Sequence, residues 1–392
     1  MTMVERPLNY LELAHFNRVV IMAAEYEGDL DAEALDRAFR ALCAAHPVLR
    51  ARIRGAGRDA VMRVEDGQVP ELLILDEAPD VLTKIVELPW DASRAVADLV
   101  LVRGERHGYL ALRADHSIVD ANGWLGYLRE LLRLFTVGEA EPAEAAGTLP
   151  APPAELFHER LGLIPYDRRL FHTAGPSILD GEGGLLSGYL RLDEEQTSWI
   201  RRTARRYGTT VHGLVSGAIL LTQRAFAGGR DPVPMFSVSP VDFRGRVEPP
   251  VGELETTNFM LSYVAEVDVS TRMSPVLVGQ SVKAQMDAAL ESGEGVRAGA
   301  PLKSALDRNL SFALVSNLGV VPEFPMPDGV EVVETHILNT VDDTLFPGYY
   351  VSTYRGRLTV LYVLTKRFFT EEDAEAIARE LQEQLLIIGA SS

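Results

Sequence analysis

Strand-like and helix-like segments alternate twice along this chain, and the alternation limits the folds that the chain can adopt. In the first half, an apolar run over 16–26 predicts a strand, and a helical pattern then begins at Asp29–Asp31 and ends at His46-Pro47. The second half restarts with a strand pattern over Leu185–Leu192 and a capped helix pattern over Asp193–Tyr207. Because strands alternate with helices in both halves, we predict an α/β (α+β) protein with two similar domains.

The composition changes between the two halves. The segment over 138–155 is rich in Ala, Glu and Pro and lacks periodicity, which is typical of a linker or a surface crossover. A less regular stretch follows it. We therefore predict an N-terminal subdomain over 1–140, a linker or crossover over 141–184 and a C-terminal subdomain over 185–392.

Charge and composition exclude several classes of protein. The 392 residues carry a formal net charge of −18, whereas a nucleic-acid-binding protein needs a basic surface, so no nucleic-acid partner is expected. The single cysteine, Cys43, excludes an internal disulfide framework and suits a reducing cytoplasm. No apolar run approaches the roughly 20 residues of a membrane span, and the first residues lack a signal-peptide pattern. We expect a cytoplasmic protein without a membrane span.

The segment Asp115-His116-Ser117-Ile118-Val119-Asp120 carries the strongest functional signal. The apolar run over 109–112 predicts a strand that ends near His116, and a helical pattern begins after Asn122. A histidine between a strand and a helix is a candidate general base, because its ordinary pKa of about 6.5 is close to neutral pH. A structural interpretation fits the local sequence equally well: Asp120 or Asn122 caps the helix, and His116 is a satisfied turn residue.

Several segments, taken together and in order, resemble the condensation-domain superfamily. This superfamily includes nonribosomal peptide condensation domains, polyketide-associated acyltransferases, plant-type acyltransferases and chloramphenicol acetyltransferase. The Asp115–Ala121 segment is similar to the family motif H-H-x-x-x-D-G, and Pro240–Arg246 resembles the segment whose arginine pairs with the motif aspartate. The opening segment over 28–51 fits the same superfamily. Ser316–Gly319 and Tyr350–Leu358 resemble the polyketide-associated (Pap-type) branch.

The resemblance implies two chloramphenicol-acetyltransferase-like subdomains in a V, with a central channel that contains the histidine. An acyl thioester on a pantetheine arm, from coenzyme A or an acyl carrier protein, would enter one mouth, and an alcohol or amine acceptor would enter the other. His116 would act as the general base, and Asp120 with Arg244 would form a structural ion pair. No permanently bound cofactor and no metal are expected, since the eight histidines show no ligand-like cluster.

The chain departs from the family motif at two positions. Asp115 replaces the first histidine, and Ala121 replaces the glycine. The plant-type branch does without the first histidine and tolerates small residues after the aspartate, so neither change excludes catalysis. A carboxylate beside His116 is nevertheless expected to raise the histidine pKa and to weaken it as a base.

Further residues are candidates for the channel, the oxyanion site or a docking surface. The backbone N–H groups of the His116–Gly123 turn are candidate oxyanion donors. Asn317 is either a turn residue or a polar group in the channel, and Ser352 is either an ordinary strand residue or channel lining. Arg202 and Arg206 belong to a basic helical cluster with Arg201 and Arg205. This cluster is either a solvated face or a dock for an acidic carrier protein. The candidate channel or oxyanion contributors are Asp115, Gly123, Asn317 and Ser352.

Two functional hypotheses remain. The first is an acyltransferase that makes an ester or amide in natural-product (polyketide or nonribosomal peptide) or lipid biosynthesis, and the intact His116, Asp120 and Arg244 favour it. The second is a condensation-like domain without acyl transfer that acts as a carrier-protein-binding partner or as a cyclase, and Asp115 and Ala121 favour it. We favour the first hypothesis.

Overall fold

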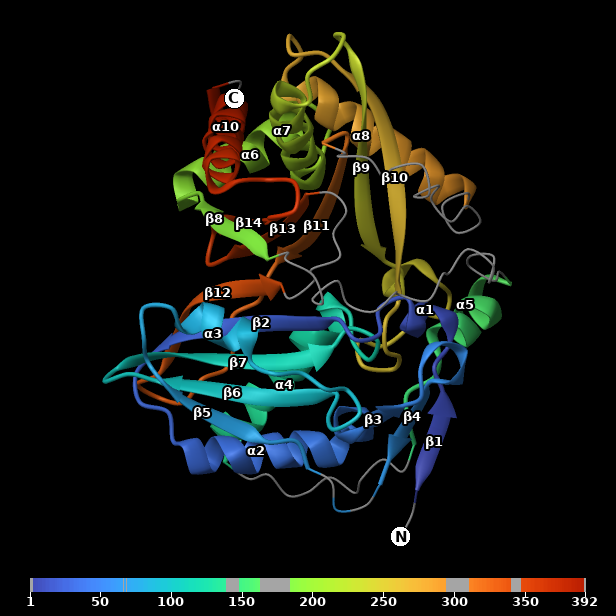
Figure 1. Cartoon of the computed structure of the whole chain (residues 1–392), viewed down its shortest axis with the longest axis vertical. Coiled ribbons are helices and arrows are strands. Elements are labelled where there is room, and N and C mark those ends of the chain that lie inside the picture. Colours follow the sequence, from blue (N-terminus) through green and yellow to red (C-terminus); the bar gives the residue numbers. More distant parts are fainter. Residues whose placement is uncertain are drawn as a thin grey trace. The chain divides into compact units, whose positions relative to one another are not determined.

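The computed structural model divides into two compact units, which are described separately (Figure 1). Unit 1 comprises residues 1–175, 242–259 and 322–341, and unit 2 comprises 176–241, 260–321 and 342–392. Two segments of the sequence range 185–392 therefore belong to unit 1. The residues described are 3–65, 67, 69–138, 148–162, 184–293, 310–339 and 347–390. Most of the predicted linker over 141–184 lies outside them.

A five-stranded sheet forms the centre of unit 1. Its strand order is β12-β2-β7-β6-β5, and all neighbours are antiparallel except β5 and β6. The sequence patterns over 98–102 and 108–113 predict a hairpin, which is present as β6 and β7. Residues 110–115 of β7 are all buried. The strands are β12 (Glu331–Asn339), β2 (Val19–Glu27), β7 (His107–Asp115), β6 (Ala97–Arg103) and β5 (Leu72–Asp76).

Two long helices of unit 1, α2 (Ala32–Ala45) and α4 (Ala121–Val137), pack on each other. Asp31 begins α2 by accepting the N–H groups of Glu33 and Ala34, and the apolar face of the helix is fully buried. Gly138 ends α4 in the left-handed conformation (φ +70°), which glycine adopts without steric cost. The shorter helices are α1 (Tyr10–Leu13), α3 (Val81–Glu87) and α5 (Pro153–Leu161).

A small antiparallel sheet of unit 1 has the order β1-β4-β3. Its strands are β1 (Val4–Pro7), β4 (Val61–Val64) and β3 (Arg52–Arg54). The sequence pattern favoured an extended segment over Leu49–Ile53, but the structure has a 3₁₀ turn over Pro47–Arg50 before β3. Proline at the first position of this turn has a fixed φ that suits a helical start.

Unit 2 contains a six-stranded sheet with the order β10-β9-β11-β13-β14-β8. Strand β11 is parallel to β9 and β13, whereas β14 is antiparallel to β13 and β8. Its helices lie together on one side of the sheet (Figure 1). The strands are β10 (Met260–Val269), β9 (Val233–Asp242), β11 (Phe312–Val320), β13 (Gly348–Tyr354), β14 (Arg357–Thr365) and β8 (Leu185–Arg191). The helices are α6 (Glu194–Arg206), α7 (Val211–Phe226), α8 (Pro275–Ser292) and α10 (Glu371–Ala390).

Helix α7 is the central helix of unit 2, with every residue from Gly213 to Arg224 buried. It packs closely on α8, because a Cβ atom on Gly217 would lie 2.2 Å from the carbonyl oxygen of Pro275. Only glycine permits such an approach between two helices. Within the described part of the chain, no helix is long and apolar enough to cross a membrane.

Candidate active site

His116 directly follows the last residue of β7. The backbone N–H of His116 donates to the carbonyl oxygen of Arg18 at 2.6 Å, which continues the pairing of β7 with β2. Asp120 then begins α4, since its Oδ1 accepts the N–H of Gly123 at 2.9 Å. The sequence thus folds locally as predicted: a strand, a histidine and a helix capped by an aspartate.

A backbone carbonyl fixes the tautomer of the His116 ring. Nδ1 lies 2.8 Å from the carbonyl oxygen of Val119, which can only accept, so the neutral ring carries its hydrogen on Nδ1. Nε2 consequently holds the lone pair. The Nδ2 of Asn258 donates to the His116 carbonyl oxygen at 3.2 Å. The same Nδ2 lies 3.4 Å from Nδ1 of His116, but both nitrogens carry hydrogens in this tautomer, so this contact is not a hydrogen bond.

Burial lowers the pKa of His116 below its ordinary value of 6.5. The carbonyl of Val119 and the carboxylate of Asp120 act in the opposite direction, and Arg18 lowers the pKa further. The prediction that Asp115 raises this pKa is wrong. The Asp115 carboxylate instead accepts the N–H of Ser117 at 3.0 Å, its Oγ–H at 2.6 Å and the N–H of Asn17 at 3.1 Å. Burial raises the pKa of Asp115 itself to about 6.

Asp120 and Arg244 form an ion pair inside unit 1, although 124 residues separate them in the sequence. The Nη1 of Arg244 lies 2.6 Å from the Oδ2 of Asp120, and both side chains are buried. The same oxygen accepts the N–H of Phe259 at 2.8 Å. Arg244 Nη1 also donates to Asp242 at 2.9 Å. Through these contacts Asp120 connects the start of α4 to Arg244 and Phe259. This is a structural role, not that of a proton carrier.

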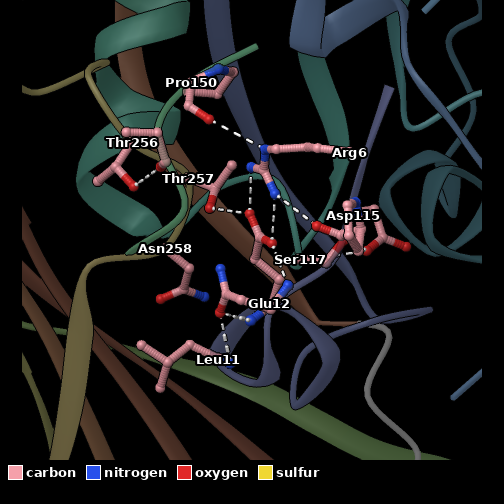
Figure 2. A network of polar contacts seen from close by, with 12 residues as sticks. Arg6, Leu11, Glu12, Asp115, Ser117, Pro150, Thr256, Thr257 and Asn258 are labelled. Carbon is pink, nitrogen blue, oxygen red and sulfur yellow. Dashed lines mark hydrogen bonds and ion pairs between the residues drawn. The ribbon is translucent and has the colours of Figure 1, made fainter. Parts of the chain in front are cut away.

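A buried carboxylate supports the segment that carries Asn258 (Figure 2). Glu12 is fully buried and accepts two hydrogen bonds from the guanidinium of Arg6, at 2.7 and 2.8 Å. The hydroxyl of Thr257 donates to Glu12 at 2.7 Å, and the hydroxyl of Thr256 donates to the carbonyl oxygen of Ala151 at 2.7 Å. Residues 256–258 are therefore anchored on two sides beside His116.

Sequence reasoning missed two neighbours of His116. The sequence pattern predicts a strand over 258–269, but β10 begins only at Met260, so Asn258 lies outside the strand. The polar triplet Thr256-Thr257-Asn258 directly before an apolar strand is a signal that could have indicated it. His15 was not singled out, yet its ring centroid lies 4.4 Å from that of His116, with 43° between the ring planes. No local pattern marks His15.

Several amides of the His116–Gly123 turn are already engaged. The N–H of Gly123 donates to Asp120, that of Ser117 donates to the Asp115 carboxylate, and that of Ile118 donates to the Asp115 carbonyl. These three amides already have acceptors, so only the other backbone N–H groups of this turn remain candidate oxyanion donors. Across the described residues, no group of three or more His, Cys, Asp or Glu side chains could hold a metal ion.

The other candidates lie in unit 2. Asn317 lies within β11, where its Oδ1 accepts the N–H of Gly319 at 2.8 Å beside a shift in the register of β11 with β13. Ser352 is buried on the neighbouring strand β13. Arg202 and Arg206 are exposed on α6. Arg202 donates to the hydroxyl of Ser198 at 2.8 Å, and the guanidinium of Arg206 lies 5.5 Å from the centre of the Tyr207 ring.

Comparison with known proteins gives the fold and the enzyme class. Residues 182–363 match the family model described as phthiocerol/phthiodiolone dimycocerosyl transferase C-terminus. The chain is 25% identical over 370 residues to the protein of that name from Mycobacterium ulcerans, with 88% of each chain covered. It is 28% identical over 297 residues to the one from Mycobacterium leprae, with 68% of this chain and 70% of the relative covered.

Solved structures support the same fold. Polyketide synthase associated protein 5 from Mycobacterium tuberculosis superposes with a TM-score of 0.78 at 20% identity, covering 98% of this chain and 97% of that one. The first condensation domain of the calcium-dependent antibiotic synthetase gives a TM-score of 0.74 at 17% identity, with the same coverage. The chain is an acyltransferase with the condensation-domain fold. His116, Asp120 and Arg244, the residues on which the sequence resemblance rests, all lie in unit 1 of this acyltransferase.

Proposed function

We propose that this acyltransferase moves an acyl group from a pantetheine thioester, on coenzyme A or an acyl carrier protein, to a hydroxyl or amine acceptor, with His116 as general base. One observation carries the proposal: the hydrogen bond from Nδ1 to the Val119 carbonyl leaves the lone pair of Nε2 free to accept a proton. The low pKa of His116 supports it, because a neutral imidazole is the form that acts as a base.

In the proposed reaction, Nε2 of His116 takes the proton of the acceptor O–H or N–H as that atom attacks the thioester carbonyl. The new bond to the carbonyl carbon forms, the tetrahedral intermediate collapses, and the C–S bond breaks. The proton on Nε2 then passes to the leaving sulfur, which restores the neutral imidazole and releases a free thiol. The Asp120–Arg244 pair keeps the loop in place throughout.

The names of the relatives support an acyl cargo and a setting in lipid or polyketide biosynthesis. The curated relatives are phthiocerol/phthiodiolone dimycocerosyl transferases, and a solved neighbour is a trichothecene 15-O-acetyltransferase from Fusarium sporotrichioides. The O-acetyltransferase superposes with a TM-score of 0.76 at 13% identity and therefore shows the fold alone. We propose a hydroxyl as the first acceptor class to test.

Replacing His116 with alanine tests the assignment. We expect turnover to fall roughly 10²–10⁴-fold, the usual contribution of a positioned acid–base group, while the thermal unfolding midpoint stays near that of the wild type. The assay is mass spectrometry of the products formed from acyl thioesters and a panel of alcohols and amines. Wild-type-like turnover in His116→Ala would rule out His116 as the base. The absence of any transfer product in the wild type would favour the domain without acyl transfer.

The pH profile provides a second measurement. Since burial lowers the pKa of His116, the base stays deprotonated to a lower pH than an exposed histidine does. The acid limb of kcat/KM should therefore lie below the ordinary value of 6.5. An acid limb above 6.5 would contradict a buried, neutral His116.

A further inference from the structure

His15 lies in the turn after α1 and places its imidazole against that of His116. The ring centroids are 4.4 Å apart and the planes are tilted by 43°. The Nδ1 of His15 is buried and has no hydrogen-bond partner among the described residues, so the ring acts in this contact as a packing surface.

The turn that carries His15 is fastened to the two residues that open the motif. The Oδ2 of Asp115 accepts the N–H of Asn17 at 3.1 Å, and the N–H of His116 donates to the carbonyl oxygen of Arg18 at 2.6 Å. Asn17 is in the left-handed conformation (φ +62°), which asparagine tolerates better than most residues, and which reverses the chain before β2. The buried Asp115, which replaces the first motif histidine, thus has an anchoring function.

The charges around the two rings favour their neutral forms. Two imidazolium ions at this separation would repel each other, and Arg18 adds a third positive charge. Burial, His116 and Arg18, in this order, lower the pKa of His15 well below its ordinary value. Of the carboxylates near His116, Asp120 raises the pKa of this histidine but is paired with Arg244, and Asp115 is hydrogen-bonded to Asn17 and Ser117.

We infer that His15 is a positioning residue for His116: its ring covers one side of the His116 imidazole, excludes water from it and holds it in the orientation that leaves Nε2 free. The inference rests on the proposed function for its kinetic consequence, but the contact itself can be tested without catalysis. In the proposed reaction His15 contacts neither the substrate nor the transferred proton, and it acts only through its contact with His116.

The experiment compares His15→Ala, which removes the ring, with His15→Phe, which keeps an aromatic ring but cannot titrate. His46→Ala is the matched control, since His46 is another partly buried histidine of unit 1 and packs edge-on against Tyr127 at 5.2 Å. Two quantities are measured for each variant: the pH profile of kcat/KM, and the titration of His116 by NMR in protein labelled at the histidine Cε1 carbons. The His116 resonance is assigned by its absence in His116→Ala.

We expect His15→Ala to expose the His116 ring to water and to raise its titration midpoint by about half a pH unit, with the acid limb of kcat/KM shifting by the same amount. We expect kcat to fall about three- to tenfold with KM little changed, because the ring is less well oriented. His15→Phe should restore the wild-type midpoint, and His46→Ala should leave it in place.

An unchanged His116 midpoint in His15→Ala would overturn the inference, as would a shift that His15→Phe fails to reverse. A shift in the NMR midpoint without any change in kcat or the acid limb would support the contact and instead count against His116 as the base. The two proposals therefore fail in different measurements.

Discussion

At the scale of single residues, the ion pair of Asp120 and Arg244 connects the start of α4 to the segment after β9 in unit 1. Removing Arg244 leaves the buried carboxylate of Asp120 without a counter-charge, which costs on the order of 3–5 kcal/mol of unfolding free energy. Removing Asp120 costs less, because Arg244 keeps its ion pair with Asp242. In urea titrations, Arg244→Met should lower the free energy of unfolding by about this amount, and Asp120→Asn should lower it by a smaller amount. The double variant should lose less than the sum, because neither charge is then left without its partner.

An exposed pair of the same unit provides the control. Arg40 and Asp36 lie 2.6 Å apart on α2 with side-chain exposures of 55% and 30%, so Asp36→Asn and Arg40→Met should each cost no more than about 1 kcal/mol. Small, fully additive effects at Asp120 and Arg244, equal to those at the control pair, would show that the buried pair contributes nothing beyond a surface contact.

At the scale of elements, a cluster of histidine and glutamate side chains crosses three strands of the unit 1 sheet. Glu25 on β2 lies between His107 on β7 and His336 on β12, with N–O distances of 2.9 and 2.7 Å. A hydrogen bond from His336 is the largest cause that lowers the pKa of Glu25 to about 2. The hydrogen bonds that His107 donates to Glu25 and Glu77 raise the pKa of His107. The cluster ties β12 to its neighbours.

These shifts predict a pH window for the attachment of β12. The contribution of Glu25 is complete above its ordinary pKa of 4.5 and is lost as the pH falls toward about 2. The contribution of His107 is complete below 6.5 and is lost as the pH rises through its raised pKa. Glu25→Gln should therefore destabilise unit 1 most between about pH 4.5 and 6.5, as measured by urea unfolding across pH. The exposed Glu27→Gln on the same strand is the control, and an equal loss at every pH would contradict the prediction.

The helices and strands also show which features of the fold can be predicted from the sequence. The sequence patterns predict that Asp31, Asp193 and Thr370 cap helices, and these residues do begin α2, α6 and α10. Such predictions succeed because a cap depends on residues within one helical turn. The strand over Val330–Thr335 was predicted, but its pairing with β2 was not. A strand pattern does not show which distant strand it pairs with.

The same limit applies to the site. The motif predicted His116, Asp120 and Arg244, since their residue types and order along the chain are local or family-like features. Asn258 contacts His116 although 142 residues separate the two in the sequence. His15 contacts His116 from the turn before β2, in which Asn17 is in the left-handed conformation. Both contacts are created by tertiary packing, so no spacing in the sequence reveals them. The predicted effect of Asp115 failed for the same reason, because neighbouring positions in the sequence do not fix where a carboxylate points.

At the scale of the whole molecule, the exposed arginines of α6 form a basic cluster on a protein whose net charge is −18. A protein with this excess of acidic groups repels an acidic carrier protein at most of its surface, so a basic patch would determine where the carrier approaches. Arg201, Arg202, Arg205 and Arg206 are all exposed in unit 2, and Tyr207 directly follows them. We propose this face of α6 as the carrier-protein dock.

Charge reversal tests the dock. Arg202→Glu with Arg206→Glu should slow transfer from an acyl carrier protein, and carrier affinity in the wild type should fall steeply with salt, because exposed charges are screened over about 8–10 Å at physiological ionic strength. Transfer from a soluble N-acetylcysteamine thioester should stay at the wild-type rate, since this donor has no carrier to dock. The matched control reverses Arg37 and Arg40, two exposed arginines of α2, and makes the same change in net charge. If the control slows the carrier-bound donor as much as the α6 variant does, the effect is one of overall charge; if neither donor is slowed, α6 presents only a solvated face.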